Sequence, residues 1–221
     1  MLTALLFIPL CAGCIMLLWG RAVICRLGLP LTALAHTALA ASIAVKVARG
    51  EAPSELGGLL APDALGVLFL MLASLLFLAA SFYAVHYLRE EERIGEHTNI
   101  LDHGRFTNAP ERRFTACLCF FLGAMTLVTI TPHMGAQWVG IEATTLSSAQ
   151  LIYFHRHKSS LEATWKYLII CSVGIALALL GNILLSVAFH GAEGATGAAD
   201  GMDQVGWFVK NAALAEPTWL K

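Results

Sequence analysis

The sequence predicts an all-α, polytopic membrane protein with about six transmembrane helices and its N-terminus outside. Hydrophobic residues make up 57% of the 221 residues, and charged residues make up only 13%, about half the share in an ordinary soluble domain. The hydrophobic residues also occur in blocks long enough to cross the hydrocarbon core of a bilayer. A formal net charge of −1 gives no reason to expect a nucleic-acid partner.

Six apolar segments account for most of the chain, which we interpret as a single membrane domain over residues 1–221. Their approximate bounds are 2–19, 28–48, 64–88, 114–131, 135–154 and 163–189. Because a backbone in hydrocarbon must satisfy its own hydrogen bonds, each segment is predicted to be a helix. Asp63 precedes the third segment and is predicted to cap its N-terminus.

Two longer connections separate these segments. Residues 89–113 are polar and mixed in charge and are predicted to form a solvated loop without a metal site, because the spacing of their acidic residues and histidines matches no ligand pattern. Residues 190–221 begin with a stretch rich in glycine and alanine. They are predicted to form an outer loop that leads toward a further helix, which this sequence does not contain.

The basic residues predict the orientation in the membrane. With the N-terminus outside, the cytoplasmic connections hold nine of them, and the outer ones hold Arg49 and Lys210, with Lys46 at a helix end and Lys221 as the last residue. The cytoplasmic set is Arg21, Arg26, Arg89, Arg93, Arg105, Arg112, Arg113, Arg156 and Lys158. This bias is typical of a multi-pass protein of a prokaryotic inner (cytoplasmic) membrane.

The cysteines give no reason to expect a cofactor in this chain. Five of the six lie inside apolar segments, where we expect them to be small packing residues. No spacing fits an iron–sulfur cluster, and no histidine pair fits a haem. The predicted cofactor set of this chain is therefore empty.

Glu142, which lies seven residues into the fifth segment, is the strongest candidate for a functional residue. It is expected about 10 Å below the outer end of its helix, too deep for a short side chain to reach water. An ionisable group at that depth costs about 2.5–3.5 kcal/mol on insertion scales. Loss of solvent disfavours the charged form, so an unpaired carboxylate there is expected to hold a proton. A proton relay and a polar clamp between two helices are both consistent with this pattern.

Other polar residues of the predicted helices are weaker candidates for a proton pathway. Thr144 and Ser148 follow Glu142 in a stretch of small hydroxyl-bearing residues that permits close helix contact. Lys166 begins the sixth segment, about 13 Å nearer the cytoplasm than Glu142 on straight antiparallel helices, and it could instead extend to the interface. His36, in the second segment, fits either a pathway residue or a satisfied contact between helices.

Several stretches of the chain resemble the antiporter-like proton-channel subunits of respiratory complex I and its relatives. The resemblance lies in WVGIEATTLSSA at 138–149, LEATWKYLII at 161–170, PDAL at 62–65, FYAVHY at 82–87 and PERRF at 110–114. Among these subunits, the sequence is most similar to the F component of group 4 membrane-bound nickel–iron hydrogenases, of the formate hydrogenlyase type. It covers only the N-terminal part of that fold.

The resemblance implies a non-catalytic, proton-translocating subunit that couples electron transfer elsewhere to proton movement. Glu142 matches the family's fifth-helix glutamate, and Lys166 matches its sixth-helix lysine. The family fold has two inverted repeats with a central lysine on the seventh helix, which lies beyond this sequence. The implied partners are lipid and the other membrane and peripheral subunits of a hydrogenase or complex I-like assembly, among them a chain that would supply the missing helices.

Two other functions fit the same sequence. One is a subunit of a multi-subunit Na⁺/H⁺ antiporter, in which transport would depend on sodium and not on a redox donor. The other is a truncated structural module that only docks neighbouring subunits. In that case a substitution at Glu142 would lower assembly and leave transport per assembled complex unchanged.

Overall fold

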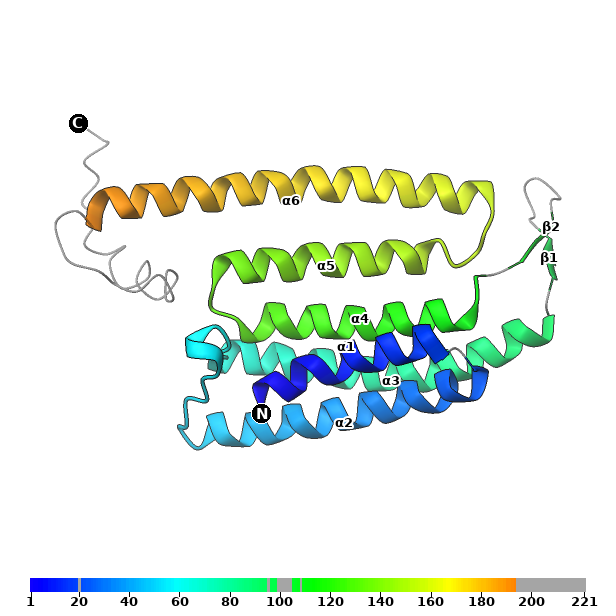
Figure 1. Ribbon diagram of the computed structural model, residues 1–221, viewed down its shortest axis with the longest axis horizontal. Helices are drawn as coiled ribbons and strands as arrows, with labels where there is room; N and C mark the ends of the chain where they lie inside the picture. The colour runs from blue at the N-terminus through cyan, green and yellow to red at the C-terminus, as the bar shows by residue number, and fades with distance from the viewer. Residues whose placement is uncertain (20, 95, 99–104, 108, 194–221) are drawn as a thin grey trace.

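The computed structural model describes residues 1–19, 21–94, 96–98, 105–107 and 109–193 (Figure 1). Within these residues the chain forms antiparallel helices, one short helical turn and one small hairpin. In order they are α1 (Leu2–Trp19), α2 (Ala22–Ala48), η1 (Leu56–Gly58), α3 (Ala64–Ile94), β1 (Glu96–Thr98), β2 (Arg105–Thr107), α4 (Glu111–Ile130), α5 (Met134–Ile152) and α6 (Lys158–Glu193). The predicted all-α class is confirmed.

Five of these helices are long and apolar enough to cross a membrane: α1, α2, α3, α4 and the part of α6 that ends at Leu184. The chain is therefore a polytopic helical membrane protein. The composition of α5 is more polar, since it contains Glu142, two glutamines and four hydroxyl-bearing residues. It nevertheless lies between α4 and α6 over most of its length (Figure 1).

The main difference from the prediction is that several helices extend beyond their apolar segments. α2 begins at Ala22, six residues before the predicted start. α3 continues to Ile94, so the predicted loop at 89–113 begins as helix and then forms the antiparallel pair β1–β2. α6 begins at Lys158 and ends at Glu193, and residues 194–221 of the predicted outer loop lie outside the described residues. The sequence prediction followed hydropathy, whereas charged residues also favour helix once a helix has left the hydrocarbon.

An ion-pair cluster accounts for two of these extensions. The Arg26 guanidinium donates from Nε to Glu111 Oε1 at 2.9 Å and also pairs with Glu92. These side chains come from the first turns of α2 and α4 and from the last turns of α3. The cluster therefore joins three helices at the end of the bundle where cytoplasm is expected.

At the opposite end, a loop carboxylate caps α1. Glu55 accepts a hydrogen bond from the backbone N–H of Thr3 at 2.8 Å and pairs with the ammonium of Met1. That ammonium, together with the Thr3 N–H, lowers the pKa of Glu55 to about 2. Asp63 accepts from the Gly66 N–H at 2.6 Å, which confirms its predicted role as the cap of α3.

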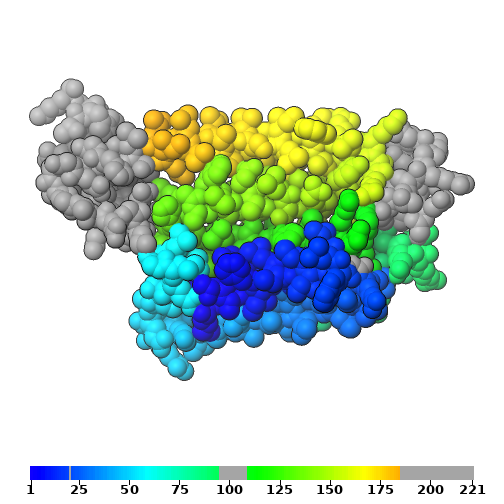
Figure 2. Space-filling view, in the orientation of Figure 1, coloured from blue at the N-terminus to red at the C-terminus, as the bar shows by residue number. Residues whose placement is uncertain are grey.

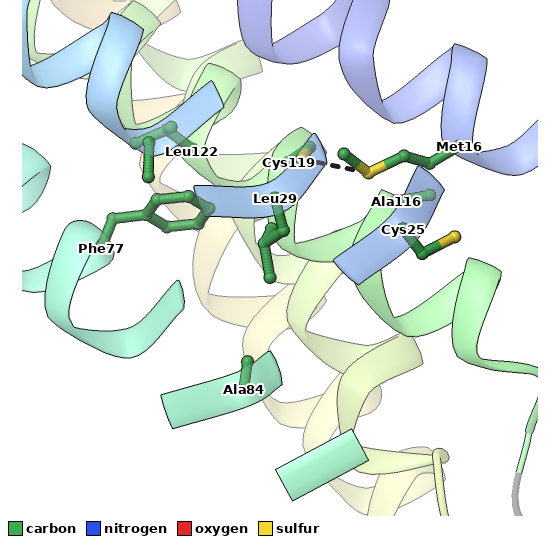
Figure 3. Packing of buried hydrophobic residues seen from close by; sticks show 9 residues of the cluster. Met16, Cys25, Leu29, Phe77, Ala84, Ala116, Cys119 and Leu122 are labelled. Carbon is green, nitrogen blue, oxygen red and sulfur yellow. Dashed lines mark hydrogen bonds between the residues drawn. The ribbon is translucent and has the colours of Figure 1, made fainter. Parts of the chain in front are cut away.

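Helices α1–α4 enclose two apolar clusters. One contains Met16, Leu29, Phe77 and Leu122, with the Cys119 Sγ 3.8 Å from the Met16 Sδ (Figure 3). The other lies nearer the Glu55 end, and its members include Leu5, Ala40, Ile43, Leu70 and Ile130. These clusters fix α1–α4 as a packed unit against which α5 lies.

Helix α6 lies at the edge of the bundle, where α5 covers one of its sides (Figures 1 and 2). Its other sides expose large apolar residues, among them Trp165, Ile170 and Leu177, which are 60%, 73% and 64% exposed. Such a surface is typical of a helix that faces lipid or further helices.

Candidate functional site

The position of α5 is set by a close approach to α4. Gly140 is buried, and a Cβ atom at this position would lie 2.7 Å from Val128 Cγ2 and 3.4 Å from the Ala124 carbonyl oxygen. Only a residue without a side chain permits this contact. The tight contact places α5, with its polar residues, beside the core of the bundle.

Glu142 lies two residues beyond Gly140 and is half-buried. It is eight residues from the start of α5, about 12 Å along the axis. Among the residues that the structure describes, none forms a hydrogen bond or an ion pair with its carboxylate. An ionisable group without a partner at this depth of a spanning bundle is typical of a functional residue.

Three hydrogen bonds fix the register between α5 and α6. The Trp138 indole N–H donates to the Ile175 carbonyl at 2.9 Å, Ser148 and Tyr167 share a bond of 2.7 Å, and the Ser160 hydroxyl donates to the Ile152 carbonyl at 2.8 Å. In two antiparallel helices with a constant register, the residue numbers of level positions add to a constant value, and these three pairs agree closely. Glu142 is therefore level with roughly positions 170–173 of α6.

The predicted hydroxyl residues have different roles. The Ser148 hydroxyl faces α6 and bonds to the Tyr167 hydroxyl. Thr144 donates to the Ile141 carbonyl of its own helix at 2.7 Å. Thr145, which the prediction did not single out, is 6% exposed. It lies three residues from both Glu142 and Ser148, so it is between them around the helix, about 60° of rotation from each.

Lys166 is not directed toward Glu142. Its Nζ donates to Glu162 Oε1 at 2.5 Å, and the two side chains are 70% and 66% exposed. Thr164 is buried, and Lys166 is two residues, or about 200° of rotation, away from it. Lys166 therefore lies on the opposite, exposed side of α6. From the register above, Lys166 is about 6–10 Å nearer the expected cytoplasmic end than Glu142, a smaller offset than straight helices predict.

His36 lies away from the α5–α6 contact, in the core of α1–α4. Its imidazole is 1% exposed, and its ring nitrogens contact the hydroxyls of Thr126 at 2.9 Å and Ser74 at 3.1 Å. The candidate residues therefore form two separate groups, one on α5 and α6 and one within the first four helices.

Tyr167, Ser74 and Thr126 were missed by the sequence analysis. Each is an ordinary polar residue in an apolar segment, and its partner is on another helix. Tyr167 belongs to the motif around Lys166, and that position in the motif could have suggested Tyr167 as a candidate. No signal in the sequence indicates that His36 meets Ser74 and Thr126, since this depends on helix rotation.

Together, the packed apolar helices define a polytopic helical membrane protein, and the half-buried carboxylate of α5 is its candidate site. No family model matches the chain. Over 127 residues, the chain is 32% identical to the hydrogenase-4 component F homolog of Methylacidiphilum infernorum (isolate V4). The match covers 57% of this chain and 25% of that relative, so the chain spans about a quarter of its length. The predicted resemblance to a hydrogenase F component is thereby confirmed.

Proposed function

We propose that this chain is a non-catalytic, proton-translocating subunit, or the N-terminal part of one, in a group 4 hydrogenase or complex I-like assembly of a prokaryotic inner membrane. The observation that carries the proposal is Glu142, a half-buried carboxylate of α5 with no partner among the described residues. It lies in the same motif that carries the resemblance. The similarity to a hydrogenase F component supports the kind of assembly. Redox centres belong to partner subunits in this proposal.

Glu142 is proposed to bind and release the transported proton. In this proposal the carboxylate takes up a proton from one side and passes it to an acceptor on the other, and a charged carboxylate in a low-dielectric region is costly unless it is paired. Its position, about 12 Å from one end of α5 and about 15 Å from the other, makes it a central site and not an entry site.

The proposed route from the cytoplasmic end begins on the side of α5 that faces α6 and turns around the helix toward Glu142. The Tyr167 hydroxyl can donate to Ser148 while the Ser148 hydroxyl donates to the Thr145 carbonyl, 2.9 Å away. Ser148 is six residues, or about 9 Å, from Glu142. Thr145 lies midway, and water completes the proposed path. In this proposal Thr144 provides a second hydroxyl beside Glu142.

Lys166 is proposed to act only in the assembled complex. Its ion pair with Glu162 lies on the side of α6 that no described residue of α5 covers. An exposed ion pair of this kind contributes little to stability, so contact with further protein could replace it. Other subunits, or a chain that supplies further helices, are the proposed cover. Once covered, the lysine charge would stabilise the ionised form of nearby acids.

The test compares Glu142→Gln with Glu51→Gln in the assembled complex. Glu51 is exposed in the connection between α2 and α3, so its substitution controls for the loss of one carboxylate. Glu142→Gln should lower proton translocation per assembled complex by on the order of 100-fold, the lower range for loss of a positioned proton-transfer group. Glu51→Gln should leave translocation unchanged. Equal translocation in the two variants would contradict the proposal.

The same preparation separates the other two functions. A Na⁺/H⁺ antiporter subunit predicts transport that depends on sodium and continues without a redox donor. A structural module predicts that Glu142→Gln reduces the amount of assembled complex, with unchanged transport in the remainder.

A further inference from the structure

A polar layer crosses the core of α1–α4 between its two apolar clusters. On α2, His36 lies between Ala33 of one cluster and Ala40 of the other. On α3, Ser74 lies between Phe77 and Leu70, and on α4, Thr126 lies between Leu122 and Ile130. These six apolar residues are members of the two clusters. All three polar side chains are 1% exposed, so the layer is closed to solvent within the described residues.

The hydroxyl protons of this layer have competing acceptors. Ser74 can donate to the Leu70 carbonyl at 2.7 Å or to His36 Nδ1 at 3.1 Å, and its hydroxyl has one proton. Thr126 can donate to the Leu122 carbonyl at 2.7 Å or to His36 Nε2 at 2.9 Å. When both hydroxyls donate to their carbonyls, each ring nitrogen faces only an acceptor and must itself carry a proton.

We propose that His36, Ser74 and Thr126 form a second proton-binding site of this protein. In the neutral ring, one N–H donates to one hydroxyl, and the other nitrogen accepts from the second hydroxyl. A proton that binds to this second nitrogen releases its hydroxyl, which rotates to its own carbonyl and then accepts from the new N–H. The layer thus has three hydrogen bonds before proton binding and four after it, and only a hydroxyl rotation separates the two states.

The two neutral tautomers also have equal numbers of hydrogen bonds. If the ring binds a proton on Nδ1 and releases one from Nε2, a proton moves from the side of α3 to the side of α4, and the reverse exchange moves it back. Both carbonyls remain bonded to helix N–H groups when a hydroxyl leaves them. The change between tautomers therefore needs only rotation of the two hydroxyls and no backbone movement, with water that reaches the layer as the donor and acceptor of the proton.

No charged group of the surrounding helices lies level with the layer. The charged side chains of α2, α3 and α4 lie about ten or more residues, at least roughly 15 Å, along the axis from His36, Ser74 or Thr126. They are Arg26, Lys46, Arg89, Glu90, Glu91, Glu92, Arg93, Glu111, Arg112 and Arg113, with Asp63 just before α3. The cysteines of the same helices and of α1, which are Cys11, Cys14, Cys25, Cys117 and Cys119, are not bonded to the layer. Without a counter-charge, the resting ring is neutral and a second proton is held only briefly.

This inference rests on the proposed function only for what the bound proton is used for. The hydrogen bonds of the site can be measured when no protons are being transported. The experiment is ¹⁵N NMR of the purified full chain labelled at histidine. The His36 signals are identified by their loss in His36→Gln. The wild-type ring should populate both neutral tautomers, since the two nitrogen–oxygen distances are similar, and it should take a second proton on acidification.

Removing either hydroxyl should select one tautomer. Ser74→Ala should favour the Nε2–H form, which keeps its bond to Thr126, and Thr126→Val should favour the Nδ1–H form. Each should shift the tautomer ratio by about tenfold, as expected for loss of one hydrogen bond. Ser81→Ala and Thr115→Val are matched controls, since both hydroxyls are buried and donate to backbone carbonyls of their own helices. Neither control should move the His36 signals.

The proposal is overturned if Ser74→Ala and Thr126→Val leave the ring in the same tautomer. It is also overturned if the wild-type ring takes no second proton at any pH at which helix content, measured by circular dichroism, is unchanged. A Glu142→Gln variant that leaves proton translocation intact would contradict the proposed function and leave this site standing, so the two failures are distinguishable.

Discussion

Ser148 and Tyr167 form the one hydrogen bond between side chains that joins α5 to α6 among the described residues, at 2.7 Å. In membrane proteins such bonds contribute about 0.6 kcal/mol on average, because each partner finds other acceptors when the contact is lost. Ser148 has such an acceptor in the Thr145 carbonyl. The bond is therefore expected to orient Tyr167 more than to stabilise the bundle.

A double-mutant cycle tests this expectation. Ser148→Ala and Tyr167→Phe should each lower stability slightly, and the double variant should show a coupling energy of about 0.6 kcal/mol, measured by unfolding of the purified chain in detergent. Tyr83→Phe is the matched control, since Tyr83 is 71% exposed, and it should show no coupling with Ser148→Ala. A coupling energy of zero between Ser148 and Tyr167 would show that their bond does not form in the protein.

For single residues, the sequence predicts which ionisable groups lie in the membrane but not which side chains they contact. Glu142 and His36 are recognisable because a polar residue stands out in an apolar segment. The outward direction of Lys166 and the meeting of His36 with Ser74 and Thr126 depend on how each helix is rotated about its axis. Hydropathy does not specify that rotation when a helix is apolar on all sides.

Among the elements, α5 is the one whose packing decides the geometry of the site. It is the most polar of the helices, and Gly140 holds it against Val128 of α4. Because a Cβ at position 140 would lie 2.7 Å from Val128 Cγ2, Gly140→Ala must separate the two helices or displace Val128. The separation would also change the distance between Glu142 and the bundle core.

Gly140→Ala is therefore expected to destabilise the chain by about 1–3 kcal/mol, the range for overpacking a close contact. Thermal unfolding in detergent measures this. Gly174→Ala on α6 is the matched control, because nothing lies within 4 Å of its added Cβ, and alanine favours helix by about 0.5–1 kcal/mol over glycine. Val128→Ala should rescue Gly140→Ala. Equal effects at positions 140 and 174 would refute the close contact.

The ends of the helices show where hydropathy stops being informative. α1 agrees with its predicted bounds because its apolar run and its helix end together. α3 and α6 continue as helix beyond their apolar runs, through Ile94 and from Lys158, where charged residues support the helix in water. The ion pairs of Arg26 with Glu92 and Glu111 join residues far apart in the sequence, so no local pattern could predict them.

For the molecule as a whole, successive helices run in opposite directions, so every second connection lies at the same end, and most basic residues are in those connections. The α1–α2 connection, the end of α3, the start of α4 and the α5–α6 connection all lie together (Figure 1). Eight of the nine basic residues assigned to the cytoplasm lie in or beside described parts of these connections, and Arg105 lies in β2. Charge on this scale determines which end stays in the cytoplasm.

The orientation can be measured by labelling single introduced cysteines in intact cells. Glu51→Cys lies at the end of the bundle opposite the basic residues, and Arg156→Cys lies in the α5–α6 connection, and both native side chains are exposed. A membrane-impermeant maleimide should label Glu51→Cys from outside and should label Arg156→Cys only after the membrane is permeabilised. The unmodified chain gives the background from its six cysteines. The reverse pattern would place the basic end outside, and the proposed path from Tyr167 through Ser148 to Glu142 would then start from the outer side of the membrane.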